Sequence, residues 1–192
     1  MLIDDFIKGQ LGFEAEQVYV YPSGQVSFER SFVAVYPGSW NPRHAGHLEL
    51  RNAAERYLDE QVEFELSVLN VDKPALTAED VVERLRQFNG HDGIILTRAA
   101  TFAEKAELFP GCVFVVGADT AARVVDPRYG DLDAAFDTFA RRFCWFLVGA
   151  RILNGVTMTL NDLMMPERYH RFFTELPLSM FAGSTLRSSE LR

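Results

Sequence analysis

The sequence lacks the features that place a chain in a membrane or direct it out of the cell. No apolar run approaches the roughly 20 residues that a membrane-spanning helix needs. Asp4 and Asp5 lie where a signal peptide has its positive region, and no long apolar run follows them. We therefore expect a cytoplasmic protein without a membrane partner.

Cysteine and positive charge are also scarce. The 192 residues include two cysteines, Cys112 and Cys144, each in an apolar run. They make no disulfide framework, so we expect two small buried side chains. The formal net charge of −8 disfavours non-specific binding to nucleic acid. A nucleotide stays compatible with this charge, because it needs only a local positive pocket.

The composition is that of one ordinary globular domain with room for a small appendage. The chain is 48% hydrophobic, which is enough to bury one core. Residues 1–30 predict an N-terminal helix-hairpin appendage, with an amphipathic helix over 2–13 and strands at 17–21 and 26–28. No residue in it suggests chemistry, so we expect a role in packing or in forming a homo-oligomer. Residues 31–192 are the predicted main domain.

Strand and helix patterns alternate through the main domain. This alternation predicts an α/β fold, with a Rossmann-like parallel five-stranded sheet and helices on both faces. Ligands of such sheets bind at the carboxyl ends of the strands. The predicted strands are 32–36, 62–69, 93–97, 113–116 and 144–149, and the predicted helices are 45–59, 77–88, 102–109 and 132–139.

Two histidines lie at the predicted start of the first helix of this domain. His44 and His47 are separated by the small residues Ala45 and Gly46, and they follow a Pro-Gly-Ser-Trp-Asn-Pro turn. At this spacing both can face the space above the strand end, beside N–H groups that the first helical turn leaves unpaired. Free amides, the positive end of a helix dipole and two imidazoles suit a phosphate.

Two other interpretations of this histidine pair have to be weighed. Hydrogen-bonded structural histidines are one, and the surrounding turn argues against them. A zinc site is the other, but a catalytic zinc normally takes three protein ligands. The remaining candidate ligands have no ligand spacing; they are His91, Cys112, Cys144 and His170. We expect no metal held by the protein.

The string from Pro37 to Leu48 resembles the signature of the HIGH-motif nucleotidyltransferase superfamily, usually G-S-F-[DN]-P-x-[HT]-x-G-H. Nicotinate/nicotinamide mononucleotide, phosphopantetheine and glycerol-phosphate nucleotidyltransferases share this signature. Here Trp stands where the family mostly has Phe. The resemblance implies that His44 and His47 are catalytic. It also implies a set of nucleotide- and phosphate-binding residues, namely Gly38, Ser39, Trp40, Asn41 and Gly46.

Two segments at later strand ends resemble further family features. Asn70 and Lys73 follow the second predicted strand, as in phosphopantetheine adenylyltransferase-like members. The resemblance implies that Lys73 reaches the reacting phosphates and that Asn70 binds substrate. A solvated lysine is the alternative. Gly117 and Asp119 resemble the G-x-D segment of mononucleotide adenylyltransferases, which implies contacts to a ribose or a base. An Asp that caps the next helix is the alternative.

The end of the chain and one arginine complete the resemblance. Arg151 falls where family members have an Arg after the fifth strand, which implies substrate binding. Ser188, Ser189 and Arg192 resemble the end of the second signature, I-S-S-T-x-[IL]-R, and imply binding of the β- and γ-phosphates. Arg187 departs from this signature, where the family has Ser. An earlier stretch, Ser184-Thr185-Leu186-Arg187, is one residue too short.

The resemblance implies one in-line displacement. A small phosphate-bearing acceptor attacks the α-phosphorus of ATP or CTP, pyrophosphate leaves, and Mg²⁺ bridges the nucleotide phosphates. Gly117, Asp119 and Arg151 favour nicotinate or nicotinamide mononucleotide as the acceptor. One alternative is a nucleotide-binding sensor or scaffold, because the terminal motif is altered. A class I aminoacyl-tRNA synthetase fragment is disfavoured, since the chain lacks a K-M-S-K-S loop, a tRNA-binding domain and a basic surface.

Overall fold

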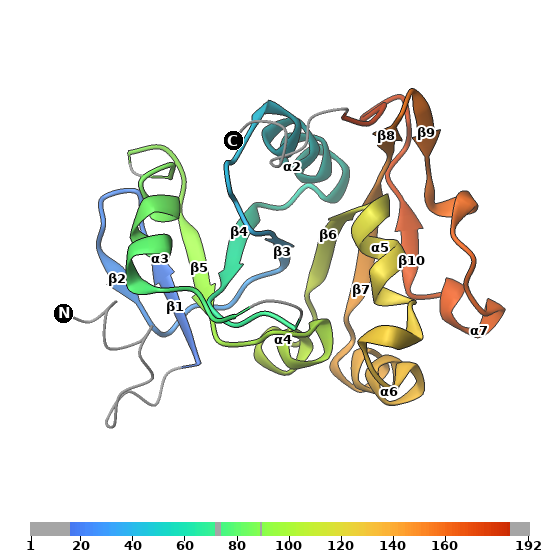
Figure 1. Ribbon diagram of the computed structural model, residues 1–192, viewed down its shortest axis with the longest axis horizontal. Helices are drawn as coiled ribbons and strands as arrows, with labels where there is room; N and C mark the ends of the chain where they lie inside the picture. Colours follow the sequence, from blue (N-terminus) through green and yellow to red (C-terminus); the bar gives the residue numbers. More distant parts are fainter. Residues whose placement is uncertain (1–15, 72–73, 89, 185–192) are drawn as a thin grey trace.

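A twisted, mostly parallel sheet runs through the molecule and carries helices on both faces (Figure 1). The computed structural model describes residues 16–71, 74–88 and 90–184. Within these residues the sheet has eight strands in the order β10-β7-β6-β3-β4-β5-β1-β2. Its strands are β1 (Gln17–Val20), β2 (Val26–Ser27), β3 (Ala34–Pro37), β4 (Val62–Ser67), β5 (Ile94–Thr97), β6 (Val113–Gly117), β7 (Trp145–Gly149) and β10 (Phe173–Glu175).

The five predicted strands are confirmed as β3 to β7, and they pair in parallel. The predicted count of five is wrong, because three more strands join them. β1 pairs antiparallel with β5, so the β1–β2 hairpin extends the sheet, and β10 pairs in parallel with β7. The hairpin joins because Val18 and Val20 are buried in the same core as β5. β10 has three residues, too few for a periodic pattern.

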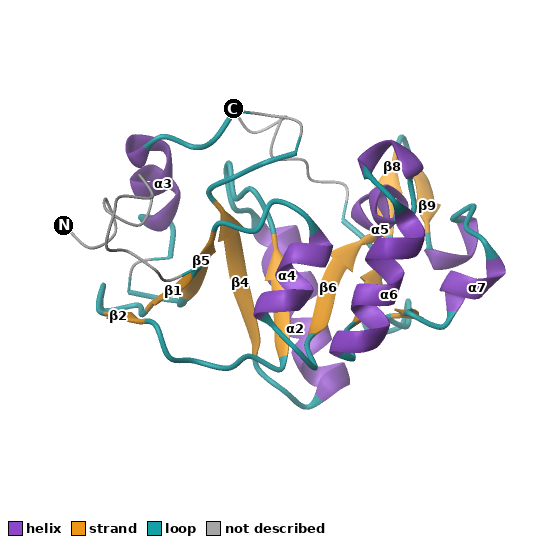
Figure 2. Cartoon of the chain, turned by 90° about the horizontal axis from the view of Figure 1, so that it is seen from below, coloured by secondary structure: helices purple, strands orange, loops and turns teal. Residues whose placement is uncertain are grey.

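Helices cover the two faces in separate groups. Side chains of α2 (Ala45–Leu58) and α3 (Ala78–Leu85) pack into one core. The opposite core receives α4 (Phe102–Leu108), α5 (Ala118–Val124), α6 (Leu132–Arg142) and α7 (Glu167–His170). Figure 2 shows α4, α5 and α6 in front of the sheet and α2 behind it. This arrangement confirms the predicted α/β class with helices on both faces.

Four of these helices were predicted, and their ends follow from local chemistry. At the start of α3 the Thr77 hydroxyl accepts a hydrogen bond from the Asp80 N–H at 3.2 Å, which satisfies one free amide. The sequence did not predict α5 or α7, nor the separate hairpin of β8 (Arg151–Leu153) and β9 (Val156–Met158). No helix of the described residues is both long and apolar enough to cross a membrane.

The boundary predicted at residue 30 stays a prediction, and the predicted helix over 2–13 lies outside the described residues. The two cysteines are free and buried, at 0% and 2% exposure, as expected.

A buried ion pair ties β4 to α4. Lys105 of α4 lies 2.7 Å from Glu65 Oε1, and both residues are less than 5% exposed. Thr97 donates to the same carboxylate oxygen at 2.5 Å, and the Lys105 ammonium also donates to the Ala99 carbonyl at 2.7 Å. This pair holds the end of β4, where Glu65 also supplies a backbone carbonyl to the neighbouring loop.

Removing one partner of this pair should destabilise the protein strongly. Lys105→Met leaves the Glu65 carboxylate buried without a counter-charge, and we expect a loss of about 3 kcal/mol in the free energy of unfolding. Urea denaturation followed by circular dichroism measures it. The double variant Glu65→Gln/Lys105→Met removes both charges and should recover most of the loss. A single-variant loss of less than about 1 kcal/mol would contradict this account.

Candidate functional site

A cavity of about 520 Å³ opens where β3 and β6 separate. The two strands pair in parallel only through Ala34 with Val113 and Val35 with Phe114. Beyond that point β3 stays paired with β4, β6 stays paired with β7, and α2 and α5 leave toward opposite faces of the sheet. In an open α/β sheet such a point of divergence is the usual ligand crevice.

The cavity wall collects side chains from four parts of the chain. They belong to the end of β3 and the following turn, the first turns of α2, the end of β6 with α5, and the segments after β7. The lining residues are Tyr36, Pro37, Gly38, Ser39, Trp40, His44, Gly46, His47, Leu50, Gly117, Asp119, Thr120, Arg123, Ala150, Arg151, Leu153, Phe181 and Ser184.

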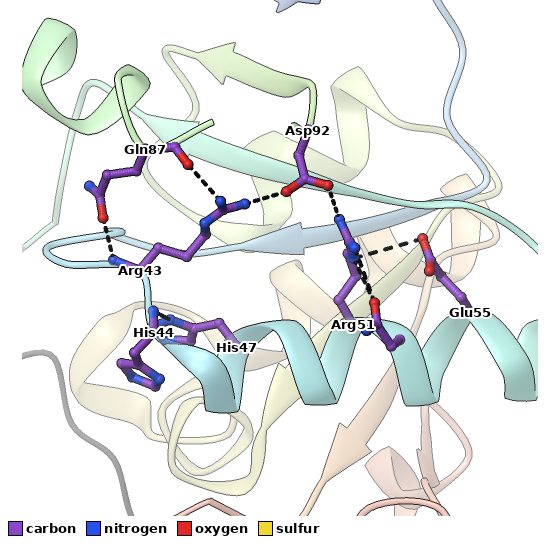
Figure 3. A network of polar contacts seen from close by, with 8 residues as sticks. Arg43, His44, His47, Arg51, Glu55, Gln87 and Asp92 are labelled. Carbon is purple, nitrogen blue, oxygen red and sulfur yellow. Dashed lines mark hydrogen bonds and ion pairs between the residues drawn. The ribbon is translucent and has the colours of Figure 1, made fainter. Parts of the chain in front are cut away.

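The two histidines stack on each other at the start of α2 (Figure 3). Their ring centroids are 3.6 Å apart and the ring planes differ by 20°. His44 is the N-cap residue with extended backbone angles, and its N–H donates to His47 Nδ1 at 3.2 Å. Since His47 Nδ1 accepts this bond, the proton of the neutral ring is assigned to Nε2. Nε2 is thereby left as a hydrogen-bond donor.

Both imidazoles are held in their neutral form. Burial, the His44 ring and the charges of Arg151 and Arg43 lower the pKa of His47 to about 3. Burial and Arg151 likewise lower the pKa of His44, against a smaller opposing effect of Glu49. His44 is 9% exposed, and among the described residues its Nδ1 has no hydrogen-bond partner. A buried ring nitrogen without a partner is costly unless a ligand satisfies it.

Trp40 is part of the scaffold of this wall. The residue is 1% exposed, and its indole N–H donates to the Glu65 carbonyl at 2.8 Å. The Gly38 N–H donates to the same carbonyl at 2.9 Å. The Trp40 ring meets His47 edge-on with centroids 5.0 Å apart. A Cβ on Gly38 would lie 2.5 Å from the Trp40 ring, so this glycine is required by the packing of the indole.

Packing also requires the glycine at position 46. Its close neighbour is Ser184, a residue that the predictions did not include. A Cβ on Gly46 would lie 2.1 Å from the Ser184 hydroxyl oxygen. Ser184 is 8% exposed, lines the cavity, and bridges in parallel to Arg151. It is the first residue of Ser184-Thr185-Leu186-Arg187, the stretch that is one residue too short for the second signature. The missing side chain at residue 46 lets this serine reach the start of α2.

The facing wall is formed by α5 and β8. Gly117 is the N-cap residue of α5, so Asp119 lies in the first turn, where a carboxylate favours the helix dipole, and not at the cap. Arg151 begins β8, and among the described residues its buried Nε has no hydrogen-bond partner. Its charge lowers the pKa of both histidines, which places a cation beside the pair.

Sequence reasoning missed several members of the wall, Tyr36 among them. Burial, with a further contribution from the Asp119 charge, raises the pKa of the Tyr36 hydroxyl above its usual range, so this phenol stays protonated. Its position two residues before Gly38, at the end of β3, was the available signal. Thr120 and Arg123 were missed because α5 itself was not predicted.

Not every predicted site residue meets at this cavity. Of the predicted residues, those that line it are Gly38, Ser39, Trp40, His44, Gly46, His47, Gly117, Asp119 and Arg151. Asn41 and the exposed Asn70 lie in the described part of the chain but do not line it. The other predicted residues lie outside the described residues and stay predictions; they are Lys73, Ser188, Ser189 and Arg192.

The assembled groups suit an anion with several oxygens. They combine neutral imidazole donors, the backbone amides at the start of α2, hydroxyl groups and the Arg151 guanidinium. Among the lining residues Asp119 is the single carboxylate. The wall therefore offers mostly donors, as a phosphate requires.

Comparison with known proteins agrees with this geometry. The model of a protein family described as cytidylyltransferase-like matches residues 35–162, about two thirds of the chain. The match includes the histidine turn, Gly117, Asp119 and Arg151. No curated protein matches the chain.

The protonation of the histidine pair can be measured directly. We expect His47 to stay neutral at pH 6, with its proton on Nε2, and His44 to titrate below the ordinary value, in ¹⁵N-resolved NMR titrations assigned with His44→Gln and His47→Gln. Arg151→Gln removes a charge that lowers both pKa values, so it should raise both. Titration of His47 near its ordinary value of 6.5 would refute the neutral pair.

The lowered pKa of His47 predicts that the stability of the protein depends on pH. Because the pKa of His47 is about 3 in the folded protein against an ordinary 6.5, the unfolded chain binds more protons between these values. The contribution of His47 is therefore fully present above pH 6.5 and is lost as the pH falls toward 3. Urea denaturation at several pH values should show wild type losing stability relative to His47→Gln in this window. Parallel curves for the two proteins would contradict the shift.

Proposed function

The chain belongs to the cytidylyltransferase-like family, and from this premise we propose that it transfers a nucleoside monophosphate from ATP or CTP to a small phosphate-bearing acceptor, with release of pyrophosphate. The observation that carries the proposal is the stacked pair of neutral histidines at the start of α2, facing one cavity together with Arg151. Neutral ring donors beside a guanidinium suit a phosphate oxygen.

The proposed reaction is one in-line displacement. An oxygen of the acceptor phosphate forms a bond to the α-phosphorus, and the bond from that phosphorus to the bridging oxygen of the β-phosphate breaks. The electron pair leaves with pyrophosphate. Catalysis then comes from positioning the two phosphates and stabilising charge on the equatorial and leaving oxygens.

The histidines contribute as fixed neutral donors. His47 Nε2–H is held in place by the bond that Nδ1 accepts from the His44 backbone, so it needs no reorientation as charge develops. His44 Nδ1 is a second buried ring nitrogen, without a hydrogen-bond partner in the described part of the chain. The Arg151 guanidinium adds the positive charge that a neutral pair lacks.

The remaining assignments are part of the same proposal. Lys73 would contact the reacting phosphates, and Ser188, Ser189 and Arg192 would contact the leaving pyrophosphate. Bound Mg²⁺ would neutralise phosphate charge. We assign this metal to the nucleotide, because the cavity wall offers a single carboxylate. Gly117, Asp119 and Arg151 favour nicotinate or nicotinamide mononucleotide as the first acceptor to test.

A second candidate is a nucleotide-binding sensor or scaffold. Arg187, where the second signature has Ser, favours it. Such a protein would bind a triphosphate without turnover.

Pyrophosphate release tests the reaction. ATP and CTP are each incubated with magnesium and a panel of phosphorylated acceptors, and we expect release with one pair. His47→Ala should lower kcat by about a hundredfold or more, the effect of losing one transition-state donor. His170→Ala changes an exposed histidine of α7 and should leave kcat unchanged.

Two outcomes would overturn the assignment. Near-normal turnover by His47→Ala would refute the catalytic role of the histidine pair. Triphosphate binding by calorimetry, with no release from any acceptor, would instead favour the sensor.

A further inference from the structure

One glutamine side chain closes the turn that precedes the histidine pair. Gln87, just after α3, donates from Nε2 to the Trp40 carbonyl at 2.9 Å and accepts at Oε1 from the Arg43 N–H at 2.7 Å. A single amide therefore joins the two ends of the Trp40–Arg43 turn. Its donor and its acceptor are both used, which fixes its orientation.

The Arg43 side chain fixes the same turn from behind. It points away from the histidines, toward Gln87 and Asp92 (Figure 3). One guanidinium nitrogen donates to the Gln87 carbonyl at 2.6 Å, and another lies 2.5 Å from Asp92 Oδ2. The guanidinium also stacks over the Phe88 ring at 4.4 Å. Although Arg43 lies beside the histidines in sequence, its side chain serves the scaffold.

Asp92 extends this anchor to α2. Its Oδ1 accepts from Arg51 at 2.5 Å while Oδ2 accepts from Arg43. Burial alone would raise the pKa of Asp92, but the hydrogen bonds from the two arginines outweigh burial and lower it. The carboxylate therefore stays charged at neutral pH. The turn and α2 are both tied to the segment between α3 and β5.

The two ends of the closed turn lead to the two contacts that orient His47. At one end, Trp40 packs edge-on against the His47 ring. At the other end, Arg43 precedes His44, whose N–H donates to His47 Nδ1. A shift of the turn would disturb both contacts at once.

We propose that Gln87 is a positioning residue for the histidine pair, supported by the Arg43–Asp92 ion pair. Its amide holds the turn in the one conformation that presents His47 Nε2 as a donor. The kinetic consequence rests on the proposed nucleotidyl transfer. The geometric consequence for His47 does not.

Gln87→Met tests this role, because methionine keeps the length of the side chain and removes both hydrogen bonds. We expect kcat of pyrophosphate release to fall by about tenfold to a hundredfold, the scale of a small misplacement of a catalytic group, with KM for the triphosphate changed less than about twofold. In ¹⁵N NMR, the His47 Nδ1 signal should lose the shift of an accepted hydrogen bond. The exposed Gln25→Met is the matched control and should change neither.

The two readouts separate this inference from the proposed function. A changed His47 signal without turnover in wild type would support the positioning role and refute the transfer reaction. An unchanged His47 signal in folded Gln87→Met would overturn the positioning role, whatever the kinetics. Should Gln87→Met not fold, Gln87→Glu keeps the length of the side chain and the acceptor for the Arg43 N–H but loses the donor to the Trp40 carbonyl. It should alter the His47 signal in the same direction, and no change there would overturn the proposal.

Discussion

The parting of β3 from β6 is the constraint on which the rest of the structure depends. The two strands share two register pairs, after which each continues only with its other neighbour. The apolar side chains of α2 and α5 lie on opposite faces, and no strand of the described residues fills the gap between the strand ends. The start of α2 lies on one side of this divergence and supplies one wall of the candidate site. The facing wall comes from α5 and from β8, which follows β7.

The charged groups of the cavity wall are more positive than those of the chain as a whole. The protein carries a formal charge of −8, yet the wall of the site combines Arg123 and Arg151 with one carboxylate. Arg151 and burial also keep the nearby imidazoles uncharged. A neutral imidazole is a hydrogen-bond donor whose position matters more than its charge. Its placement therefore has to come from the surrounding contacts, and the Trp40 ring and the His44 backbone provide them.

The sequence predicted those parts of the fold that have a long local pattern. The β-branched and aromatic runs of β3 to β7 are confirmed, and so is the helix that follows the Pro-Gly-Ser-Trp-Asn-Pro turn. β10 has three residues, and a segment so short has no readable period. The hairpin was predicted, but its pairing with β5 depends on residues about 80 positions apart.

The residues of the candidate site also divide into those that a local sequence pattern predicts and those that only the tertiary structure shows. Motif residues such as His44, His47 and Arg151 could be found because each follows a strand end. Gln87 and Asp92 could not, since they reach the turn from more than 40 residues away and have no motif of their own. The resemblance implied that Gly38 and Gly46 bind nucleotide or phosphate. Their nearest neighbours are the Trp40 ring and the Ser184 hydroxyl, and only the tertiary structure shows that.

The two walls of the cavity differ in how tightly their side chains are packed and hydrogen-bonded. This difference decides where a substitution is tolerated. On the α2 side, buried rings, the hydrogen bond that the Glu65 carbonyl accepts and the two that the Gln87 amide makes leave the turn little freedom. On the α5 side, Asp119 and Leu153 are half-buried and Arg123 is exposed. A substitution there costs little packing, whereas a substitution in the turn disturbs several contacts at once. The candidate site can therefore change on the α5 side while the α2 side stays as it is.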